Sequence, residues 1–365
     1  MHPPAFLWPY WTSDVASVPG RIRVRPDDFR VDEVPAYAPA GHGTHLFVRF
    51  EKEGLGTSEA VRRLARALGV DARRASWAGL KDRHAVTTQW VSFEGAAETD
   101  PEAVAIEGVR VLQSARHPRK LRTGHLRGNR FRIRVRDVPE DRMQAVRDVL
   151  TVLERDGVPN YYASQRFGRE GDNVERARAW IVDGARRPRD RRQRKWDVSV
   201  LQSWLFNMVL ADRVADGLFD RAVQGDVMRK EDTGGMFVSE DRDADQARMA
   251  RWEISPTGPM FGSRMRVAAG EQRRREEAAL TRSGVPVAAL DRLGRLGPGT
   301  RRSLRVRPRA PSLEPAEDGL ILSFELPAGA YATAVLRELL KEGLHEGPTA
   351  AVEPPDGNRT PGRGV

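Results

Sequence analysis

The chain has 365 residues, of which 39% are hydrophobic, and a formal net charge of +10. This length predicts two domains or one large elaborated domain, and polyanions are the natural partners of so basic a protein. The absence of cysteine excludes disulfides, thiol catalysis and cysteine-ligated zinc. No apolar run approaches the ~20 residues of a membrane span, and no secretory signal opens the chain. We therefore expect a cytoplasmic protein without membrane association.

The first hundred residues predict strands around one helix. Residues 26–33 read as a turn leading into a short strand. Residues 44–50 alternate, with apolar side chains on one face, and predict a second strand. The apolar spacing of residues 57–69 predicts a helix that Thr57 or Ser58 can cap.

The turn that follows carries the most informative residues. It places one carboxylate, Asp82, between Lys81 and Arg83, while Gly79 permits a tight backbone. Residues 87–93 predict a strand leaving the turn. The two cations would favour the ionised form of the aspartate. An ionised aspartate on a loop held by rigid elements suits nucleophilic or base chemistry, and a solvated charged turn is the alternative.

Residues 130–136 predict the clearest strand of the chain. Phe131, Ile133 and Val135 lie on one face, and four arginines lie on the other. The arginine face is either an exposed, solubilising charge row or a surface that contacts phosphates. Helical spacing then predicts a helix over residues 143–153.

The composition changes near residues 155–160. Aromatic and basic residues alternate over 161–168, and residues 185–195 are rich in arginine. A helix is predicted from 199 to a stop at Gly217, with an apolar stripe whose simplest role is core packing. A Gly- and Arg-rich stretch over 294–311 predicts a long connection.

The C-terminal part predicts one more strand and helix. Residues 320–326 alternate as a strand, 327–330 form a turn, and Tyr331 lies just before a helix over about 333–344. A Pro-, Gly- and Thr-rich composition predicts a disordered tail over 346–365. The sequence shows no internal repeat, no phosphate-loop pattern and no paired-histidine metal spacing.

The order of residues around the aspartate is more specific than their types. The string Gly79–Trp90 closely resembles the catalytic motif of the TruD family of tRNA pseudouridine synthases. Further segments resemble motifs of that family in the same order, and they are 26–33, 126–131, 158–168 and 326–333. The resemblance covers most of residues 20–345, and a chance match would not preserve the order.

The resemblance implies roles for individual residues. Asp82 would be the catalytic aspartate, Phe29 would stack near the target base and Asn129 would help bind substrate. Tyr331, where the family often has Phe, would supply a final aromatic ring. Possible supporting residues are Lys81, Arg23 (where the family has Lys), Phe131 and Gln89. From residue types alone, Phe29 and Phe131 could equally be core residues, and Asn129 a turn residue.

The resemblance also implies the architecture. We expect the α/β (α+β) class, with a pseudouridine synthase catalytic domain built on a mixed, largely antiparallel sheet. This domain would comprise 1–156 and 311–345, interrupted by a family-specific inserted α/β domain over 157–310.

The implied function is isomerisation of uridine to pseudouridine in tRNA, at position 13 if the family rule holds. A single aspartate is sufficient, and because nothing is oxidised and no atom is added, we expect no cofactor and no metal. The expected partner is tRNA, with no membrane and a monomeric protein. The alternative is a non-catalytic tRNA-binding protein or RNA-folding chaperone. A metal-dependent nuclease is a third possibility, but the motifs lack clustered carboxylates.

Overall fold

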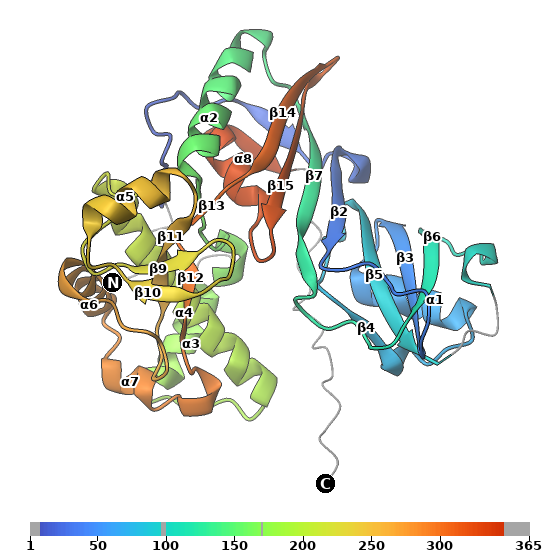
Figure 1. Cartoon of the computed structure of the whole chain (residues 1–365), viewed down its shortest axis with the longest axis horizontal. Helices are drawn as coiled ribbons and strands as arrows, with labels where there is room; N and C mark the ends of the chain where they lie inside the picture. The colour runs from blue at the N-terminus through green and yellow to red at the C-terminus, as the bar shows by residue number, and fades with distance from the viewer. Residues whose placement is uncertain (1–7, 96–99, 169–170, 347–365) are drawn as a thin grey trace. The chain divides into compact units, whose positions relative to one another are not determined.

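A computed structural model describes residues 8–95, 100–168 and 171–346. The contacts of the chain form two compact units (Figure 1). The sheet unit contains Ser17–Arg147, Arg309–Ala330 and Glu342–Val365. The helix-rich unit contains Met1–Ala16, Asp148–Pro308 and Tyr331–Lys341.

The sheet unit is built on one mixed sheet of ten strands. Seven of them form the path β14-β15-β7-β2-β5-β3-β6, in which only the β2–β5 pair is parallel, while β1, β4 and β16 extend it. The sheet is therefore mixed and largely antiparallel, as predicted. The strands are β1 (Gly20–Ile22), β2 (Phe29–Pro35), β3 (His45–Glu53), β4 (Ala75–Trp77), β5 (Val86–Glu94), β6 (Val109–His117), β7 (Leu126–Arg136), β14 (Arg309–Ala316), β15 (Gly319–Pro327) and β16 (Leu344–Glu346).

Helix α1 (Thr57–Ala67) covers one part of this sheet. Leu64 packs with Phe50 of β3 and Phe93 of β5 in one buried cluster, so the predicted strand and helix are confirmed. The predicted cap is wrong. Gly56 is the N-cap residue, and the Thr57 hydroxyl makes hydrogen bonds outside the helix.

Strand β7 confirms the predicted alternation and decides between its two interpretations. Its apolar face is buried. On its other face every arginine meets a carboxylate, in the pairs Arg130–Glu325 (2.6 Å), Arg132–Glu314 (3.4 Å), Arg134–Asp318 (2.6 Å) and Arg136–Asp28 (2.6 Å). Because these charges are already compensated, the row fits a paired sheet face better than a phosphate-contacting surface.

The helix-rich unit surrounds a four-stranded sheet of order β10-β9-β11-β12. A separate two-stranded sheet pairs β13 with β8. The strands of the unit are β8 (Val158–Pro159), β9 (Val227–Lys230), β10 (Met236–Val238), β11 (Ile254–Met260), β12 (Thr300–Ser303) and β13 (Arg305–Val306). Its helices are α3 (Asp172–Ile181), α4 (Arg191–Ala215), α5 (Arg242–Ala250), α6 (Gly270–Ser283), α7 (Val287–Asp291) and α8 (Ala332–Leu340). Helix α2 (Met143–Asp156) begins in the sheet unit and ends in this one.

Three predictions for these segments need correction. Helix α4 begins at Arg191, earlier than expected, because Asp190 caps it by accepting a hydrogen bond from the Arg192 amide. The stretch 294–311 is not a long connection, since it contains β12, β13 and the start of β14. Helix α8 ends at Leu340 rather than near 344. Trp204 of α4 is buried in the main core of the unit, as predicted.

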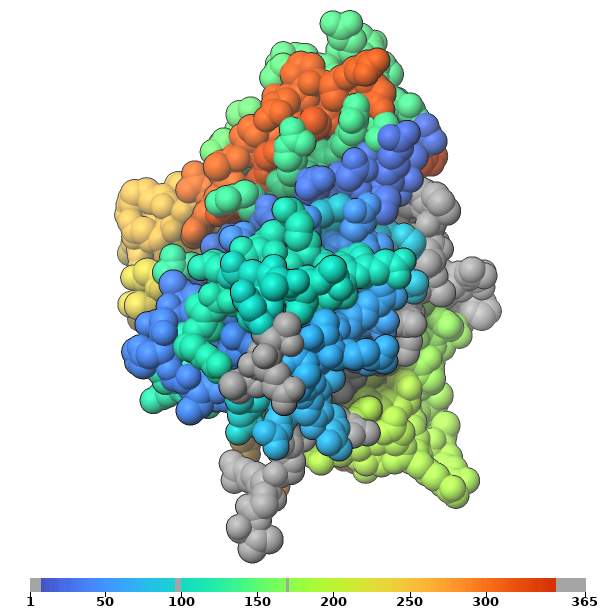
Figure 2. Space-filling view, turned by 90° about the vertical axis from the view of Figure 1, so that its right-hand side faces the viewer, coloured from blue at the N-terminus to red at the C-terminus, as the bar shows by residue number. Residues whose placement is uncertain are grey.

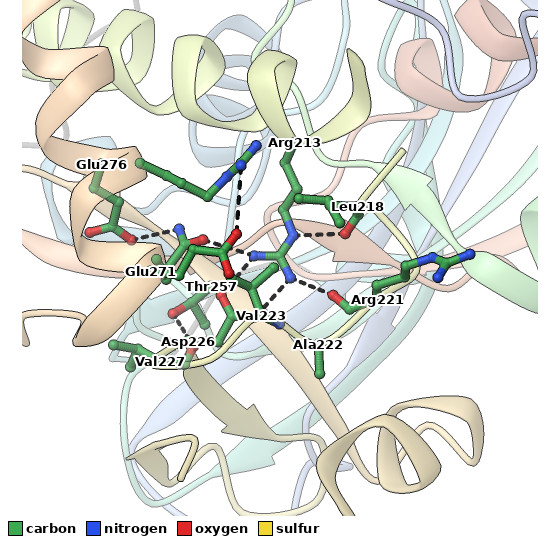
Figure 3. A network of polar contacts seen from close by, with 12 residues as sticks. Arg213, Leu218, Arg221, Ala222, Val223, Asp226, Val227, Thr257, Glu271 and Glu276 are labelled. Carbon is green, nitrogen blue, oxygen red and sulfur yellow. Dashed lines mark hydrogen bonds and ion pairs between the residues drawn. The ribbon is translucent and has the colours of Figure 1, made fainter. Parts of the chain in front are cut away.

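The core of the helix-rich unit also contains a buried polar network (Figure 3). Arg213 of α4 donates two hydrogen bonds of 2.7 Å to the carboxylate of Asp226 and one of 3.2 Å to Gln272 of α6. Gln272 in turn donates to Glu276, which is paired with Arg301 of β12 at 2.7 Å. The network joins helices α4 and α6 to β12 by groups that are satisfied inside the core.

The two units differ from the predicted domains in the placement of some residues. Residues 8–16, 148–156 and 331–341 pack with the helix-rich unit, whereas the prediction placed them in the interrupted domain; the domain assignment itself stays a prediction. Glu346 belongs to β16, and the rest of the predicted disordered tail lies outside the described residues. No helix in the described ranges has the length and apolar character needed to cross a membrane.

We expect Asp226→Asn to lower the free energy of unfolding by about 3–5 kcal/mol, because it leaves the Arg213 charge buried without its carboxylate. Urea unfolding of the full chain measures the change. Asp243→Asn is the matched control, since that carboxylate is exposed and its loss should cost less than about 1 kcal/mol. Equal losses in the two variants would show that the buried pair is not a major source of stability.

Candidate active site

The turn that carries Asp82 lies between β4 and β5, which pair antiparallel. Its backbone is tied to the fold through the Thr57 hydroxyl and the Gln89 side chain. Thr57 Oγ1 accepts from the Lys81 amide at 2.9 Å and donates to Gln89 Oε1 at 3.0 Å. Gln89 Nε2 donates to the Gly79 carbonyl at 3.3 Å. Gln89, predicted as a supporting residue, thus holds the turn rather than facing solvent.

Lys52 holds the backbone of the aspartate itself. Its side chain leaves β3 on the same face as Phe50 and is only 1% exposed. Lys52 Nζ donates to the Asp82 carbonyl oxygen at 2.6 Å. Burial lowers the pKa of Lys52 to about 8. The positive charge of Lys81 also lowers this pKa, whereas the negative charge of Asp82 raises it. Sequence reasoning missed this residue, although a lysine at an inward position of an alternating strand is a readable signal.

Lys81 is buried in an ion pair with Glu33 of β2. The distance from Lys81 Nζ to Glu33 Oε2 is 2.8 Å, and the two side chains are 5% and 1% exposed. Glu33 Oε1 also accepts from the Trp90 amide at 3.2 Å. The two cations that flank Asp82 were expected to favour its ionised form, but their contacts lie elsewhere. Lys81 pairs with Glu33, and Arg83 Nε donates to the Gly54 carbonyl.

Arg23 supplies the ion pair to Asp82. Its Nη2 lies 3.0 Å from Asp82 Oδ2, and its guanidinium lies over the Phe29 ring, 4.3 Å from the centroid. The side chain of Asp82 is 57% exposed, whereas that of Arg23 is 11% exposed. Arg23 also has a φ of +57°, a conformation that costs a non-glycine residue ~1–3 kcal/mol. The carboxylate is thus held by one oxygen and open to an incoming molecule.

Phe29 and Phe131 both lie in the core of the sheet unit. Phe29 is 1% exposed, and its ring meets that of Phe131 edge-on at 6.3 Å. Phe131 also contacts Phe324 at 5.5 Å. Because Arg23 lies on the Phe29 ring, a base could stack there only after that guanidinium moves.

Asn129 of β7 lies beside Glu33, the residue that pairs with Lys81 of the Asp82 turn. It is the register partner of Glu33 on one side and of Leu326 on the other. Within the described residues, its Oδ1 is buried without a hydrogen-bond partner, and such an acceptor needs an explanation. A Cβ at the preceding Gly128 would lie 2.1 Å from the Leu326 carbonyl oxygen, so only glycine lets the strands meet here. Asn129 is therefore a strand residue with a free acceptor, not a turn residue.

Tyr331 belongs to the helix-rich unit, where it is the N-cap residue of α8 and is 40% exposed. Its ring centroid lies 6.4 Å from that of Tyr162. The Arg302 guanidinium lies over the Tyr162 ring at 4.3 Å, and burial lowers the pKa of Arg302. Tyr331 is thus a partly exposed aromatic residue in an aromatic and basic setting.

The sheet unit therefore brings most of the predicted site residues into one set of contacts. They are Asp82, Arg23, Phe29, Lys81, Gln89, Asn129 and Phe131, and the structure adds Lys52, Thr57 and Glu33. In the parts of the chain that the structure describes, no three His, Asp or Glu side chains are grouped as metal ligands.

Comparison with known proteins identifies the family. The profile of the family "tRNA pseudouridine synthase D (TruD)" matches residues 8–187 and 182–339. This chain belongs to the TruD family. It is 49% identical over 340 residues to a tRNA pseudouridine synthase D from Anaeromyxobacter sp. (strain Fw109-5), covering 92% of this chain and 96% of that protein. It is 43% identical to a tRNA pseudouridine synthase D of Thermus thermophilus, covering 92% of each.

A solved TruD structure shares the fold. The crystal structure of a putative tRNA pseudouridine synthase D from Methanosarcina mazei superposes with a TM-score of 0.73 at 24% identity. The superposition covers 91% of this chain and 96% of that one. The two stretches matched by the TruD profile include every site residue named above.

The lowered pKa of Lys52 predicts a pH-dependent stability. Between pH 8 and 10.5, Lys52 holds more protons in the unfolded chain than in the folded chain. The contribution of Lys52 to the free energy of unfolding therefore rises with pH. Lys52→Met lacks the titration. We therefore expect the stability of Lys52→Met relative to wild type to fall from about pH 7.5 to about pH 10, as measured by urea unfolding.

Lys230→Met, which removes an exposed lysine, controls for the loss of a lysine in general. If the curves of free energy against pH for wild type and Lys52→Met ran parallel, Lys52 would not titrate in this range.

Proposed function

We propose that this protein isomerises uridine to pseudouridine in tRNA, at position 13, with Asp82 as its catalytic group. Family membership supports the reaction and the substrate. The observation that carries the assignment to Asp82 is the combination of three features. Its carboxylate is exposed, one carboxylate oxygen accepts a hydrogen bond from Arg23, and its main chain is fixed by Lys52. We further propose that it acts as a monomer in the cytoplasm and without a cofactor.

The reaction conserves all atoms of the nucleotide. The N1–C1′ bond breaks, the uracil rotates, the C5–C1′ bond forms, and a proton leaves C5 while N1 gains one. Asp82 either attacks C1′ or removes a proton from the ribose, and both routes use the carboxylate. Arg23 gives that carboxylate a charge-assisted hydrogen bond, which fixes its orientation before the substrate arrives.

The remaining residues would bind the flipped nucleotide. The target base has to leave its stack to reach the carboxylate. Asn129 offers a free acceptor and an amide donor to a uracil edge or a ribose. Tyr331 offers an exposed ring face for stacking, worth ~1–3 kcal/mol per base. Phe29 would also stack on the base once the Arg23 guanidinium leaves its ring. Because the same guanidinium bonds to one Asp82 oxygen, binding of the base would release that oxygen.

Asp82→Asn is expected to reduce conversion by at least about three orders of magnitude, since it keeps the shape of the side chain but removes the nucleophile or base. The measurement is position-resolved uridine-to-pseudouridine conversion in a tRNA transcript, with chelator present. Tight tRNA binding by the variant should persist.

Asp141→Asn makes the same chemical change at an exposed carboxylate of the sheet unit and should retain full conversion. Undiminished conversion by Asp82→Asn would remove this residue from the mechanism. If wild type bound tRNA but converted no uridine, the protein would be a tRNA-binding protein or chaperone instead.

Lys52→Met is expected to lower kcat by about ten- to a hundredfold and leave KM nearly unchanged, because a displaced main chain misplaces the carboxylate without removing a substrate contact. The dependence of the initial conversion rate on tRNA concentration gives kcat and KM, with Lys230→Met as control. A change confined to KM would assign Lys52 to substrate binding.

A further inference from the structure

The basic residues from 119 to 136 fall into two groups that differ in their charge partners. The later group is the arginine row of β7, and each member has a carboxylate. The earlier group is Arg119, Lys120, Arg122 and Arg127, and all four are exposed. Among the ion pairs of the described residues, none includes a member of this earlier group. The unpaired cations of this stretch thus lie in the loop before β7 and at the start of β7.

We propose that residues 118–127, the loop before β7 together with the first two residues of β7, contact the RNA backbone beside the target nucleotide. We call this segment the basic loop. Identification of the polyanion as tRNA rests on the proposed function. An RNA phosphate would be the first anionic partner of these cations, and its binding would release the counterions condensed on the RNA. The paired arginines of β7 would first have to leave their carboxylates.

The position of the basic loop is fixed relative to the Asp82 turn. The Gly124 amide donates to the carbonyl of Ala78, in the segment that leads into Asp82, at 2.8 Å. Leu121 is buried in one cluster with Ala78, and its amide donates to Ser92 Oγ at 2.9 Å. The cations therefore belong to a segment that is bonded to the Asp82 turn. An RNA strand bound to them would pass close to Asp82. The part of the chain around residue 100 and beyond, teal in Figure 2, faces the viewer there.

A second basic run, residues 186–195, lies in the helix-rich unit and is mostly exposed. Part of it has other contacts, since Arg194 donates to the carbonyls of Pro188 and Arg189 and Arg187 lies over Trp180. The basic loop differs from it by its hydrogen bond to the Asp82 turn. It is therefore a cationic surface whose position beside the Asp82 turn is fixed, so that it can hold the nucleotides next to the target.

The test compares two triple variants of the full chain that lose the same charge. Arg119→Gln/Lys120→Gln/Arg122→Gln removes unpaired cations of the basic loop. Its matched control, Arg62→Gln/Arg110→Gln/Arg132→Gln, removes three exposed arginines of the same unit that are paired with glutamates. Affinity for an unmodified tRNA transcript is measured between about 50 and 300 mM salt, in the Asp82→Asn background so that turnover plays no part, and urea unfolding checks that both variants fold.

We expect the slope of log affinity against log salt to fall by about two to three for the basic-loop variant, and by less than about one for the control. Equal slopes in the two variants, or a lowered slope only when Arg186, Arg187 and Arg189 are replaced, would overturn the proposal. If wild type bound tRNA but converted no uridine, the proposed function would fail while the slopes would still decide the role of the basic loop.

Discussion

The buried ion pair between Lys81 and Glu33 is the constraint on which the rest of the site depends. Two charges this deeply buried are stable only together, because removing either partner leaves the other uncompensated. The pair joins the Asp82 turn to β2, and β2 carries Phe29 at its start and lies beside Asn129 of β7. One interaction therefore sets the position of the turn relative to both strands. Lys52 and Thr57 then fix the main chain on either side of the peptide between Lys81 and Asp82.

The basic residues divide into those paired with carboxylates inside the fold and those left for a partner. A net charge of +10 does not identify which cations face an anion, since every arginine of the β7 row is compensated inside its own unit. The cations that remain for a partner lie where the chain has no acidic neighbour, as in the basic loop. Pairing, rather than the density of arginine in the sequence, separates the two kinds of surface.

Much of the fold could be predicted from local patterns, and the missing parts share a physical cause. The alternation of β3 and β7 and the spacing of α1 report burial directly. Strands β12 and β13 were missed because a segment rich in glycine and arginine lacks the apolar alternation that predicts a strand. Their partners, β11 and β8, lie far away in the sequence. The family motif named Asp82 and Asn129, but the roles of Lys52 and Glu33 depend on contacts across 30 and 48 residues, which no local pattern records.

Two energetically unfavourable features of the sheet unit concern residues of the proposed site. Arg23 keeps a left-handed backbone conformation while it holds the carboxylate and covers Phe29, and Asn129 keeps a buried acceptor that no described group satisfies. Each costs about 1–3 kcal/mol. Under the proposed function, a bound uridine would offer a donor to Asn129 and would take the place of the guanidinium on the Phe29 ring. Because the same guanidinium also bonds to one oxygen of the Asp82 carboxylate, binding of the base and release of that oxygen would be one event.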